Sequence, residues 1–224
     1  MLKKEPVRVV LESLTHPLYK LYSGSLRYWE YYDMEMVVKP GIFHPGWFVT
    51  SVMLLETLET IDVKGKSVLE MGCGAGALAC RAAQKGALSF GSDITNSACT
   101  NTDENALKNG LDVHVLQSDL FDQMDESYQF DFIFVNPPFI PRYPESEDDF
   151  AFCCGEGYEY YISLFDRLKN HLLRGGEMIM ALAKSCDLNR ILEIADLEKV
   201  NYERITSKRK WSETNYLYRF SFQG

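Results

Sequence analysis

Short apolar runs alternate with helical patterns along the chain from Lys64 onward. This alternation is typical of repeated βα units, which build a parallel sheet with helices on both of its faces. The strands predicted by the pattern lie at 67–71, 87–91, 112–117, 130–135 and 177–183. The helices predicted between and after these strands lie at 75–85, 96–109, 158–173 and 187–199. The pattern therefore indicates an α/β fold.

Capping residues mark the ends of several predicted helices. Asn96 is a suitable N-cap for the second helix, and Gly110 is a suitable stop signal after it. The Arg-Gly-Gly run at 174–176 is expected to close the third helix. Beyond the last helix, residues 202–206 and 215–222 alternate like the arms of a hairpin, with a loop expected between them. The sheet is thus predicted to end in an antiparallel pair.

Residues 1–60 follow a different pattern. Helical spacing is present at 7–15 and 48–60, and an aromatic-rich stretch at 19–32 lies between them. Because these pieces are short and closely spaced, we interpret residues 1–60 as an extension or lid packed on a core of residues 61–224. The aromatic side chains are expected to brace that core, with a substrate platform as the alternative.

Composition narrows the class of protein. At 224 residues the chain fits one domain of ordinary α/β size. The start has no apolar signal-peptide core, and no stretch approaches the ~18 uncharged apolar residues of a membrane span, so we expect a soluble, cytoplasmic protein with no membrane partner. The six cysteines form no CxxC pair and have no His at metal-ligand spacing, so we expect reduced thiols and no metal. The net charge of −9 argues against extensive contacts with a phosphate backbone.

The tetrapeptide Asn136-Pro137-Pro138-Phe139 carries the strongest chemical signal. It follows an apolar run typical of a buried parallel strand, so the Asn136 amide is delivered to the carboxyl end of that strand. The prolines have no N–H and cannot continue the ladder, so their carbonyls are expected to remain free acceptors. Phe139 offers a face on which a flat group can stack. This frame suits a planar N–H donor, although an Asn before proline also caps turns.

A glycine loop at 72–76 follows the first predicted strand. Glycines at this place let the backbone pass close to a bound ligand. Gly72, Gly74 and Ala77 also satisfy the GxGxxA form of the dinucleotide fingerprint, so a nicotinamide-dependent oxidoreductase is a competing interpretation. Glu70 stands at the entrance of the loop, where it would repel a pyrophosphate and favour a cationic ammonium or sulfonium ligand.

Acidic residues also follow the next two predicted strands. Asp93 ends the second strand, where a carboxylate can accept both hydroxyls of a ribose. Asp119 lies near the end of the third strand, where it could accept from an adenine amine. Either residue alone could instead cap a helix. Together with Glu70 and Asn136, however, they place polar groups at four consecutive strand ends, which indicates one shared ligand site.

Two of these segments resemble motifs of a known family. Residues 68–76, VLEMGCGAG, resemble the first motif of class I S-adenosylmethionine-dependent methyltransferases, and NPPF resembles the fourth motif of their amino-methylating branch. NPPFIP at 136–141, with GEGY at 155–158 opening a helix, most resembles the HemK/PrmC-type glutamine methyltransferases. The resemblance spans 39–222. It implies a Rossmann-like, seven-stranded and mostly parallel sheet with an antiparallel last strand, here preceded by the short helical and aromatic extension.

The resemblance also implies S-adenosylmethionine as co-substrate, with no metal. We assign cofactor binding to groups at the four strand ends, namely Glu70, Gly72, Cys73, Gly74, Gly76, Asp93, Ile94, Asp119, Leu120 and Asn136. Methyl transfer is assigned to Asn136, Pro137, Pro138 and Phe139. The Asn136 side-chain oxygen and the Pro137 carbonyl would each accept an N–H of the acceptor, which aims the nitrogen lone pair at the sulfonium methyl. Phe139 would stack on the target plane.

The acceptor is less sharply defined. We expect a protein glutamine, methylated on N5, with adenine N6 or guanine N2 of RNA or DNA as the alternative. A catalytically silent scaffold subunit is an interpretation from a different class, and a small activating partner subunit is a further prediction. The weaker candidates for substrate contact are His44, Trp47, Lys208, Arg209 and Trp211. The last three belong to the basic run in the expected loop at 207–214, which should lie on the same edge as NPPF.

Overall fold

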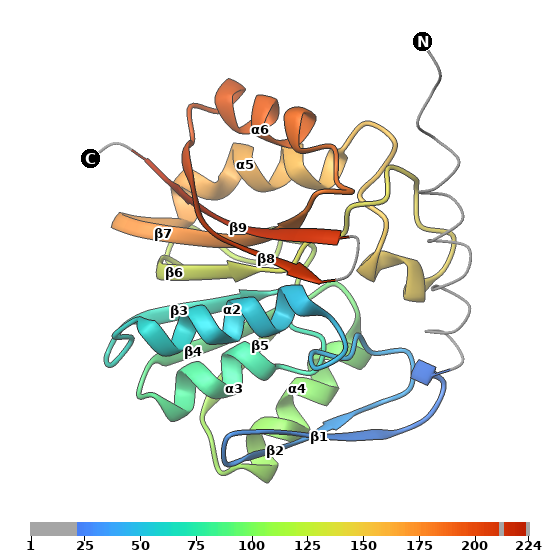
Figure 1. Ribbon diagram of the computed structural model, residues 1–224. Coiled ribbons are helices and arrows are strands. Elements are labelled where there is room, and N and C mark those ends of the chain that lie inside the picture. The colour runs from blue at the N-terminus through green and yellow to red at the C-terminus, as the bar shows by residue number, and fades with distance from the viewer. Residues whose placement is uncertain (1–21, 211–212, 223–224) are drawn as a thin grey trace.

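Residues 22–210 and 213–222 are described by the structure, a computed structural model. Within them, a seven-stranded sheet has the strand order β5-β4-β3-β6-β7-β9-β8 (Figure 1). Its strands are β3 (Ser67–Met71), β4 (Leu88–Asp93), β5 (Val113–Gln117), β6 (Phe130–Val135), β7 (Leu172–Ala183), β8 (Asn201–Lys210) and β9 (Glu213–Ser221). The strands from β5 to β7 are parallel, and β9 runs antiparallel to both β7 and β8. The predicted fold class is confirmed.

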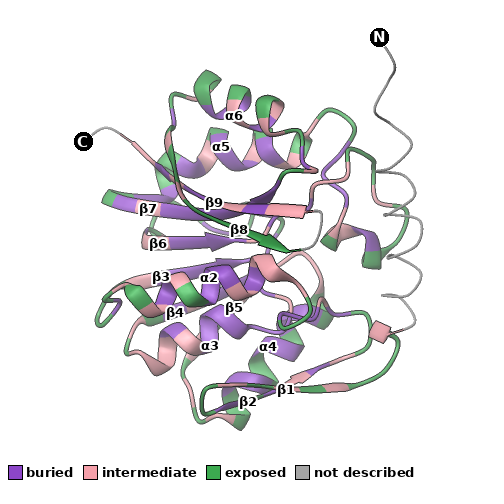
Figure 2. Cartoon of the chain, viewed as in Figure 1, coloured by how far each residue is buried: buried purple, intermediate pink, exposed green. Residues whose placement is uncertain are grey.

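Helices cover both faces of the sheet (Figure 1). One layer contains α2 (Val49–Thr60), α3 (Ala77–Gln84) and α4 (Asn96–Lys108), and the other contains α5 (Glu159–His171) and α6 (Leu188–Leu197). The strands are buried on both sides, as Figure 2 shows for the middle of the sheet. Val68 and Phe134 pack with α2 and α3, whereas their neighbours Leu69 and Val135 pack with α5 and α6. This period of two explains the near-continuous apolar runs of β3 and β6.

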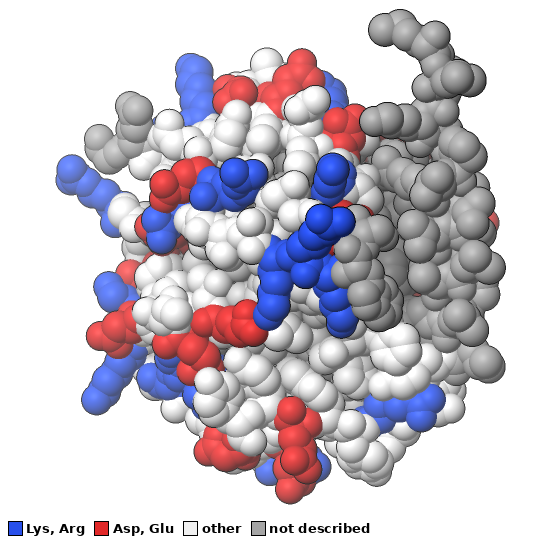
Figure 3. All heavy atoms as spheres, in the orientation of Figure 1, with Lys and Arg blue, Asp and Glu red and all other residues white. Residues whose placement is uncertain are grey.

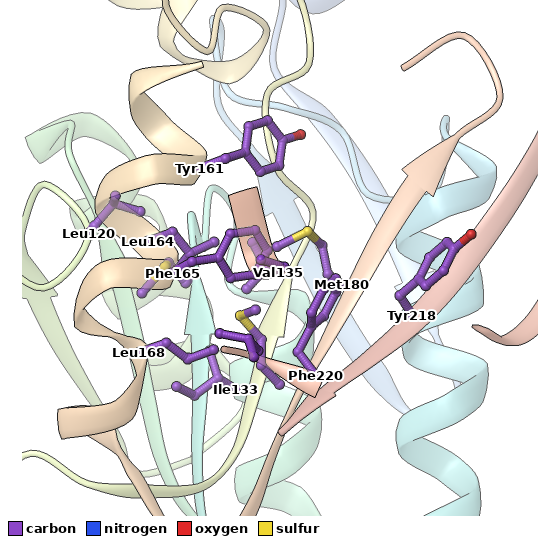
Figure 4. Close-up of a cluster of buried hydrophobic side chains, with 14 of the residues drawn as sticks. Leu120, Ile133, Val135, Tyr161, Leu164, Phe165, Leu168, Met180, Tyr218 and Phe220 are labelled. Atoms are coloured by element: carbon purple, nitrogen blue, oxygen red, sulfur yellow. The ribbon is translucent and has the colours of Figure 1, made fainter. Parts of the chain in front are cut away.

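The core beneath α5 is a cluster of aliphatic and aromatic side chains (Figure 4). Leu164, Phe165 and Leu168 project from α5 towards Ile133 on β6 and towards the neighbouring strands. All six cysteines are buried and free of disulfides. Packing explains their presence.

The region before β3 contains a hairpin that was not predicted from the sequence pattern. Its strands are β1 (Arg27–Tyr31) and β2 (Met34–Val38), which pair antiparallel to each other and stand apart from the main sheet. Met34 and Met36 are buried and belong to the same core cluster as α2 and α3. The aromatic-rich stretch thus includes a strand, whose Tyr and Trp residues suit one and whose burial alternates along it.

Three asparagines on α4 hold the outer edge of β2. Asn105 accepts from the Val37 N–H at 2.8 Å and donates to the Val37 carbonyl at 2.8 Å. Asn109 makes the equivalent pair of bonds to Glu35, and Asn101 accepts from the Lys39 N–H while also donating to Val37. Their i, i+4, i+8 spacing places the amides on one face of the helix. They satisfy backbone groups that a further strand would otherwise satisfy.

The helix predicted at 48–60 is confirmed as α2, and the one predicted at 7–15 lies outside the described residues. The division into 1–60 and 61–224 stays a prediction. Leu54 and Leu58 of α2 share a core cluster with β3, β6 and β7, so this helix is an integral layer of the fold.

Two helix boundaries differ from those predicted. The N-cap of α4 is Thr95, whose side chain accepts from the Ala98 N–H, and Asn96 is the first helical residue. The third predicted helix ends at His171, and 174–176 lies inside β7. The ladder with β6 shifts register there. Phe130 of β6 pairs with Leu172, but Phe132, two residues later, pairs with Glu177, which lies five residues further along β7. The glycines therefore serve a bulge in the strand.

The expected loop at 207–214 is also largely strand. β8 continues through Lys210, and its last four residues pair with 213–216 of β9. Residues 211–212, between the two strands in the chain, lie outside the described residues. The residues at the end of β8 are exposed, so they show no alternation of apolar and polar positions. The sequence pattern therefore did not predict a strand there.

Candidate active site

A cleft of about 1740 Å³ opens at the carboxyl ends of the parallel strands. Residues that follow β3, β4, β5 and β6 all line it. The chain runs outward from β3 to β5 and then returns to the other side of β3 with β6, so the strand order reverses between β3 and β6. Ligands of open parallel sheets bind at such a reversal, because two loops diverge there and leave a crevice.

The glycine loop follows β3, and its Gly72 and Gly74 line the cleft. Gly72, Gly74 and Gly76 all have positive φ, of 69°, 53° and 76°, a conformation that other residues adopt only with strain. A Cβ on Gly76 would lie 2.5 Å from Thr102 on α4, so α3 and α4 require a glycine there. A Cβ on Gly72 would meet nothing within 4 Å. Gly72 therefore faces open space on the ligand side of the loop.

Glu70 lies buried beneath this loop. Its Oε2 accepts from the backbone N–H of Ala79 at 2.8 Å, in the first turns of α3. Burial raises the pKa of the Glu70 carboxyl to about 8, although the Ala79 and Leu78 N–H groups oppose that rise. Phosphates bind helix N-termini through these same backbone donors. Because Glu70 occupies them and adds an acidic group, the site is unsuited to a pyrophosphate.

Asp93 ends β4 beside the glycine loop. One carboxylate oxygen accepts from the Gly74 N–H at 3.1 Å, and the other accepts from the N–H and hydroxyl of Thr95 at 3.0 Å each. Burial raises the pKa of Asp93, and it also raises that of Asp119 beyond β5. Both residues line the cleft, together with Cys73, Ile94 and Leu120. The structure thus brings the predicted cofactor residues to one cleft, except Gly76, which does not line it, and their binding roles stay predictions.

Asn136 and the two prolines follow β6 and line the cleft. The Asn136 Nδ2 donates to the Ser51 hydroxyl of α2 at 3.1 Å. The Pro138 carbonyl accepts from the Tyr161 hydroxyl of α5 at 2.9 Å, so it is not the free acceptor predicted from the sequence. Among the described residues, no donor is recorded for the Asn136 Oδ1 or the Pro137 carbonyl. That these two oxygens bind a ligand stays a prediction.

Aromatic side chains line the cleft near this motif. Phe139 is half-buried and packs partly on the core. Phe43 and Phe48 stack with ring centroids 4.3 Å apart, and the ring centroids of Phe43 and Phe152 are 6.2 Å apart. All four line the cleft, as does Trp47, whose side chain is 47% exposed. This part of the cleft can hold a flat or apolar group.

The other predicted substrate residues are placed elsewhere. His44 is buried, its Nδ1 accepts from the Gly46 N–H at 3.1 Å, and burial lowers its pKa, as expected for a structural histidine. Lys208 pairs with Glu56 of α2 at 3.0 Å, outside the residues that line the cleft. Arg209 does not line the cleft either, whereas Lys210 does. Basic side chains gather over β8 (Figure 3). Trp211 lies outside the described residues.

Three residues of this site were missed. Ser51 and Tyr161 hold the NPPF motif, and Lys184 lines the cleft after β7. Ser51 and Tyr161 lie on helices whose packing against β6 is a tertiary property, so no local pattern pointed to them. For Lys184 a sign existed, because it directly follows the fifth predicted strand at the same edge of the sheet.

The charge of the cleft is predominantly acidic. Among the described residues that line it, the acids are Glu70, Asp93, Asp119, Glu147, Asp148 and Glu213, and the basic residues are Arg142, Lys184 and Lys210. Arg142 pairs with Asp149 at 3.5 Å. No group of three or more metal-ligating side chains occurs in the described ranges, and none of the helices there is long and apolar enough to cross a membrane.

Comparison with known proteins identifies the family. Residues 33–210, most of the chain, match the methyltransferase small domain. The chain belongs to this family. It is therefore a class I methyltransferase that uses S-adenosylmethionine, and the resemblance stated from the two motifs is confirmed. The oxidoreductase and silent-scaffold interpretations are set aside with it.

Among the relatives of this chain are proteins named for methylation of proteins and of ribosomal RNA. A Methanocaldococcus jannaschii protein, provisionally named a protein N5-glutamine methyltransferase, is 34% identical over 149 residues, 64% of this chain and 73% of that relative. The ribosomal RNA small subunit methyltransferase C of Alcanivorax borkumensis is 34% identical over 143 residues, 58% of this chain. That stretch is only 43% of the Alcanivorax enzyme, so the chain spans less than half of its length.

A solved structure shares the fold. The 16S rRNA N2 G1207 methyltransferase of T. Thermophilus, in complex with AdoMet and guanosine, superposes with a TM-score of 0.66 at 21% sequence identity. The superposition covers 88% of this chain and 50% of that one. At this identity the likeness concerns the fold alone.

Proposed function

We propose that the protein transfers the methyl group of S-adenosylmethionine to N5 of a protein glutamine. The observation that carries the proposal is the pair of acceptors at the end of β6, the Asn136 Oδ1 and the Pro137 carbonyl, for which no donor is recorded among the described residues. A primary amide presents two N–H donors in one plane. Two fixed acceptors can bind both of them and thereby orient the nitrogen.

The chemistry explains the need for such a frame. An amide nitrogen is a weak nucleophile because its lone pair is delocalised into the carbonyl. Acceptors on its N–H groups stabilise the positive charge that develops as the nitrogen attacks the methyl carbon. The N–C bond forms as the C–S bond of the sulfonium breaks, which leaves neutral S-adenosylhomocysteine. The amide nitrogen then releases one proton to solvent, so no strong base is needed beforehand.

The charge of the cleft favours a protein over a polynucleotide. Six acidic side chains line it against three basic ones, and one of the basic ones, Arg142, is paired with Asp149. A nucleic-acid site needs a basic surface that neutralises several phosphates. The aromatic lining at Phe43, Phe48 and Phe152 can instead enclose the aliphatic stem of a glutamine and its peptide neighbours.

A second candidate is N2 of a guanine in ribosomal RNA. The observation in its favour is Phe139 beside the acceptor pair, since a flipped base needs a stacking face as well as hydrogen-bond acceptors. The amino group of guanine also presents two N–H donors. The basic residues over β8 could contact its phosphates.

One experiment separates the two acceptors. The protein is incubated with a cell extract and S-adenosylmethionine carrying a tritiated methyl group, and the products are digested with protease or with nuclease. The proposal expects label that protease releases and nuclease does not, and acid hydrolysis should convert it to volatile methylamine, as for N5-methylglutamine. Label sensitive to nuclease would refute the glutamine assignment and support the guanine. An Asn136→Ala preparation provides the background.

The predicted partner subunit is addressed in the same assay. The proposal includes a protein in the extract that activates the chain without being methylated. The purified chain is also assayed on a fractionated acceptor peptide with no other protein present. Activity equal to that in the extract would contradict that part.

A further inference from the structure

We propose that Ser51 and Tyr161 are positioning residues that give the NPPF motif its acceptor character, by holding it from opposite faces of the sheet. Ser51 lies on α2 and Tyr161 on α5, and these helices belong to different layers. The inference deepens the proposed function, because it concerns how the same motif selects an N–H donor.

Ser51 holds the Nδ2 end of the Asn136 amide against α2. A side-chain amide has a donor end and an acceptor end of nearly equal size, so hydrogen bonding decides its orientation. The Ser51 hydroxyl, 7% exposed, accepts from Nδ2 at 3.1 Å. With Nδ2 held against α2, the Oδ1 is turned away from it. Both residues line the cleft, so this choice is made at the site itself.

Tyr161 determines which proline carbonyl remains available. Its hydroxyl donates to the Pro138 carbonyl at 2.9 Å, and its ring is fully buried. The ring lies at the end of the cluster formed by Leu164, Phe165 and Val135, so packing limits its movement (Figure 4). Pro138 is thereby anchored to the core, and the acceptor of the preceding residue, Pro137, is left for a ligand.

The two contacts have a common chemical consequence. If the Asn136 amide turned over, it would present N–H groups to the N–H groups of the acceptor, and donor would face donor. If the Pro138 anchor were lost, the Pro137 carbonyl would no longer be held at a fixed distance from Oδ1. In both cases the acceptor nitrogen loses its orientation, while the glycine loop and the acidic strand ends keep theirs.

The test compares Ser51→Ala with Ser51→Thr. Ser51→Ala should lower kcat about tenfold, the effect of losing one orienting hydrogen bond, with the Kd for S-adenosylmethionine unchanged within about twofold. Ser51→Thr, which retains a hydroxyl, should restore kcat. A merely structural role would lower the melting temperature without this selective loss and rescue.

Ser67→Ala is the matched control. Ser67 starts β3, at the opposite end of the strand from the cleft, and its hydroxyl bonds to Asp131. The Ser67→Ala variant therefore loses a serine hydroxyl and a side-chain hydrogen bond at a place away from the site. Its kcat should stay at the wild-type value.

Tyr161→Phe provides an independent arm, since it removes only the hydroxyl. We expect a similar fall in kcat, with cofactor affinity retained and the unfolding transition still cooperative. Wild-type kcat in both Ser51→Ala and Tyr161→Phe would overturn the inference. If those variants are impaired but the methylated product is a base, only the glutamine assignment fails. If Asn136→Ala itself stays active, the proposed mechanism fails as a whole.

Discussion

The carboxylate of Glu70 accepts a hydrogen bond of 2.8 Å from the backbone N–H of Ala79, which ties the end of β3 to the first turns of α3. The GxGxxA sequence of the glycine loop also fits dinucleotide-binding enzymes, but the backbone donors that follow it have a different partner in this protein. The donors that would otherwise cradle a pyrophosphate are directed at a protein carboxyl group.

The first prediction is ligand choice. The chain should bind S-adenosylmethionine and should not bind NAD, because the phosphates of NAD would face Glu70 in place of free backbone N–H groups. Titration calorimetry with each ligand checks this. Tight NAD binding without any response to S-adenosylmethionine would contradict it.

The second prediction is the pH dependence of cofactor binding. With a pKa of about 8, Glu70 is mostly protonated in the ligand-free protein at neutral pH. A cationic ligand favours the carboxylate, so binding releases a proton, and the Kd for S-adenosylmethionine should fall as pH rises towards 8, by at most about tenfold per pH unit. Calorimetry between pH 6 and about 9 measures the slope, because this range spans the raised pKa of the buried carboxyl.

The control for this prediction is Glu70→Gln, whose side-chain oxygen can still accept from the Ala79 N–H. Its affinity should be lower and largely independent of pH. The free energy of unfolding should change with pH in the opposite sense to the affinity for the cofactor. Because the folded pKa lies above the ordinary Glu value, the ligand-free wild type should lose stability as pH rises from the ordinary pKa through 8, and Glu70→Gln should not. Equal slopes in the two proteins would count against the assignment.

The third prediction concerns Asn136→Ala. Loss of the orienting oxygen should lower kcat by about 10²- to 10³-fold, the range seen when a single stabilising group is removed from an active site. The Kd for S-adenosylmethionine should change little, since the glycine loop and Asp93 remain. Single-turnover kinetics with equilibrium binding separates the two effects. A joint loss of binding and turnover would assign Asn136 to the cofactor instead.

The fourth prediction distinguishes two glycines of the same loop. Gly76→Ala forces a methyl against Thr102 at 2.5 Å and should lower stability by about 1–3 kcal/mol beyond the backbone strain. Gly72→Ala suffers only the strain of its φ of 69°, about 1–2 kcal/mol, and should mainly weaken cofactor binding. Gly110→Ala, with φ of 64° and open space after α4, is the control for strain alone. Thermal unfolding and cofactor titration of all three test the order.

The fifth prediction concerns the asparagines between α4 and β2. Asn105 is fully buried and bonds to Val37 and to the Ala75 carbonyl, so Asn105→Ala leaves buried backbone groups unpaired. The cost should be about 1–3 kcal/mol, seen as a lower midpoint in urea. Asn109→Ala, at a more exposed position, should cost less than half as much. Equal effects would indicate that burial does not govern these bonds.

Much of the fold followed from local patterns. The strands β3 and β6 are buried on both faces, so their apolar runs were visible without any knowledge of their neighbours. The end of β8 was missed because its residues are exposed and show no alternation, whereas β1 and β2 were missed although the burial of their residues alternates. The Arg-Gly-Gly run at 174–176 was misassigned, since the same residues suit a helix end and a strand bulge.

The candidate site divides in a similar way. Residues at strand ends could be grouped from sequence, because parallel strands bring their carboxyl ends to one edge. Lys208 was grouped with them on the same reasoning, yet its side chain reaches Glu56 on α2. Position along a strand gives the edge of the sheet, but the direction of a long side chain depends on its neighbours.

By itself, the sequence determined the α/β architecture, the glycine loop and the NPPF motif, because burial period, glycine and proline act on the chain within a few residues. Only the tertiary structure decided which atoms of that motif face a ligand. Ser51 lies 85 residues before Asn136, and Tyr161 lies 23 residues after Pro138. The contacts of Ser51 and Tyr161 with the motif form only when two helices from opposite layers pack against the same strand, so no local pattern determines them.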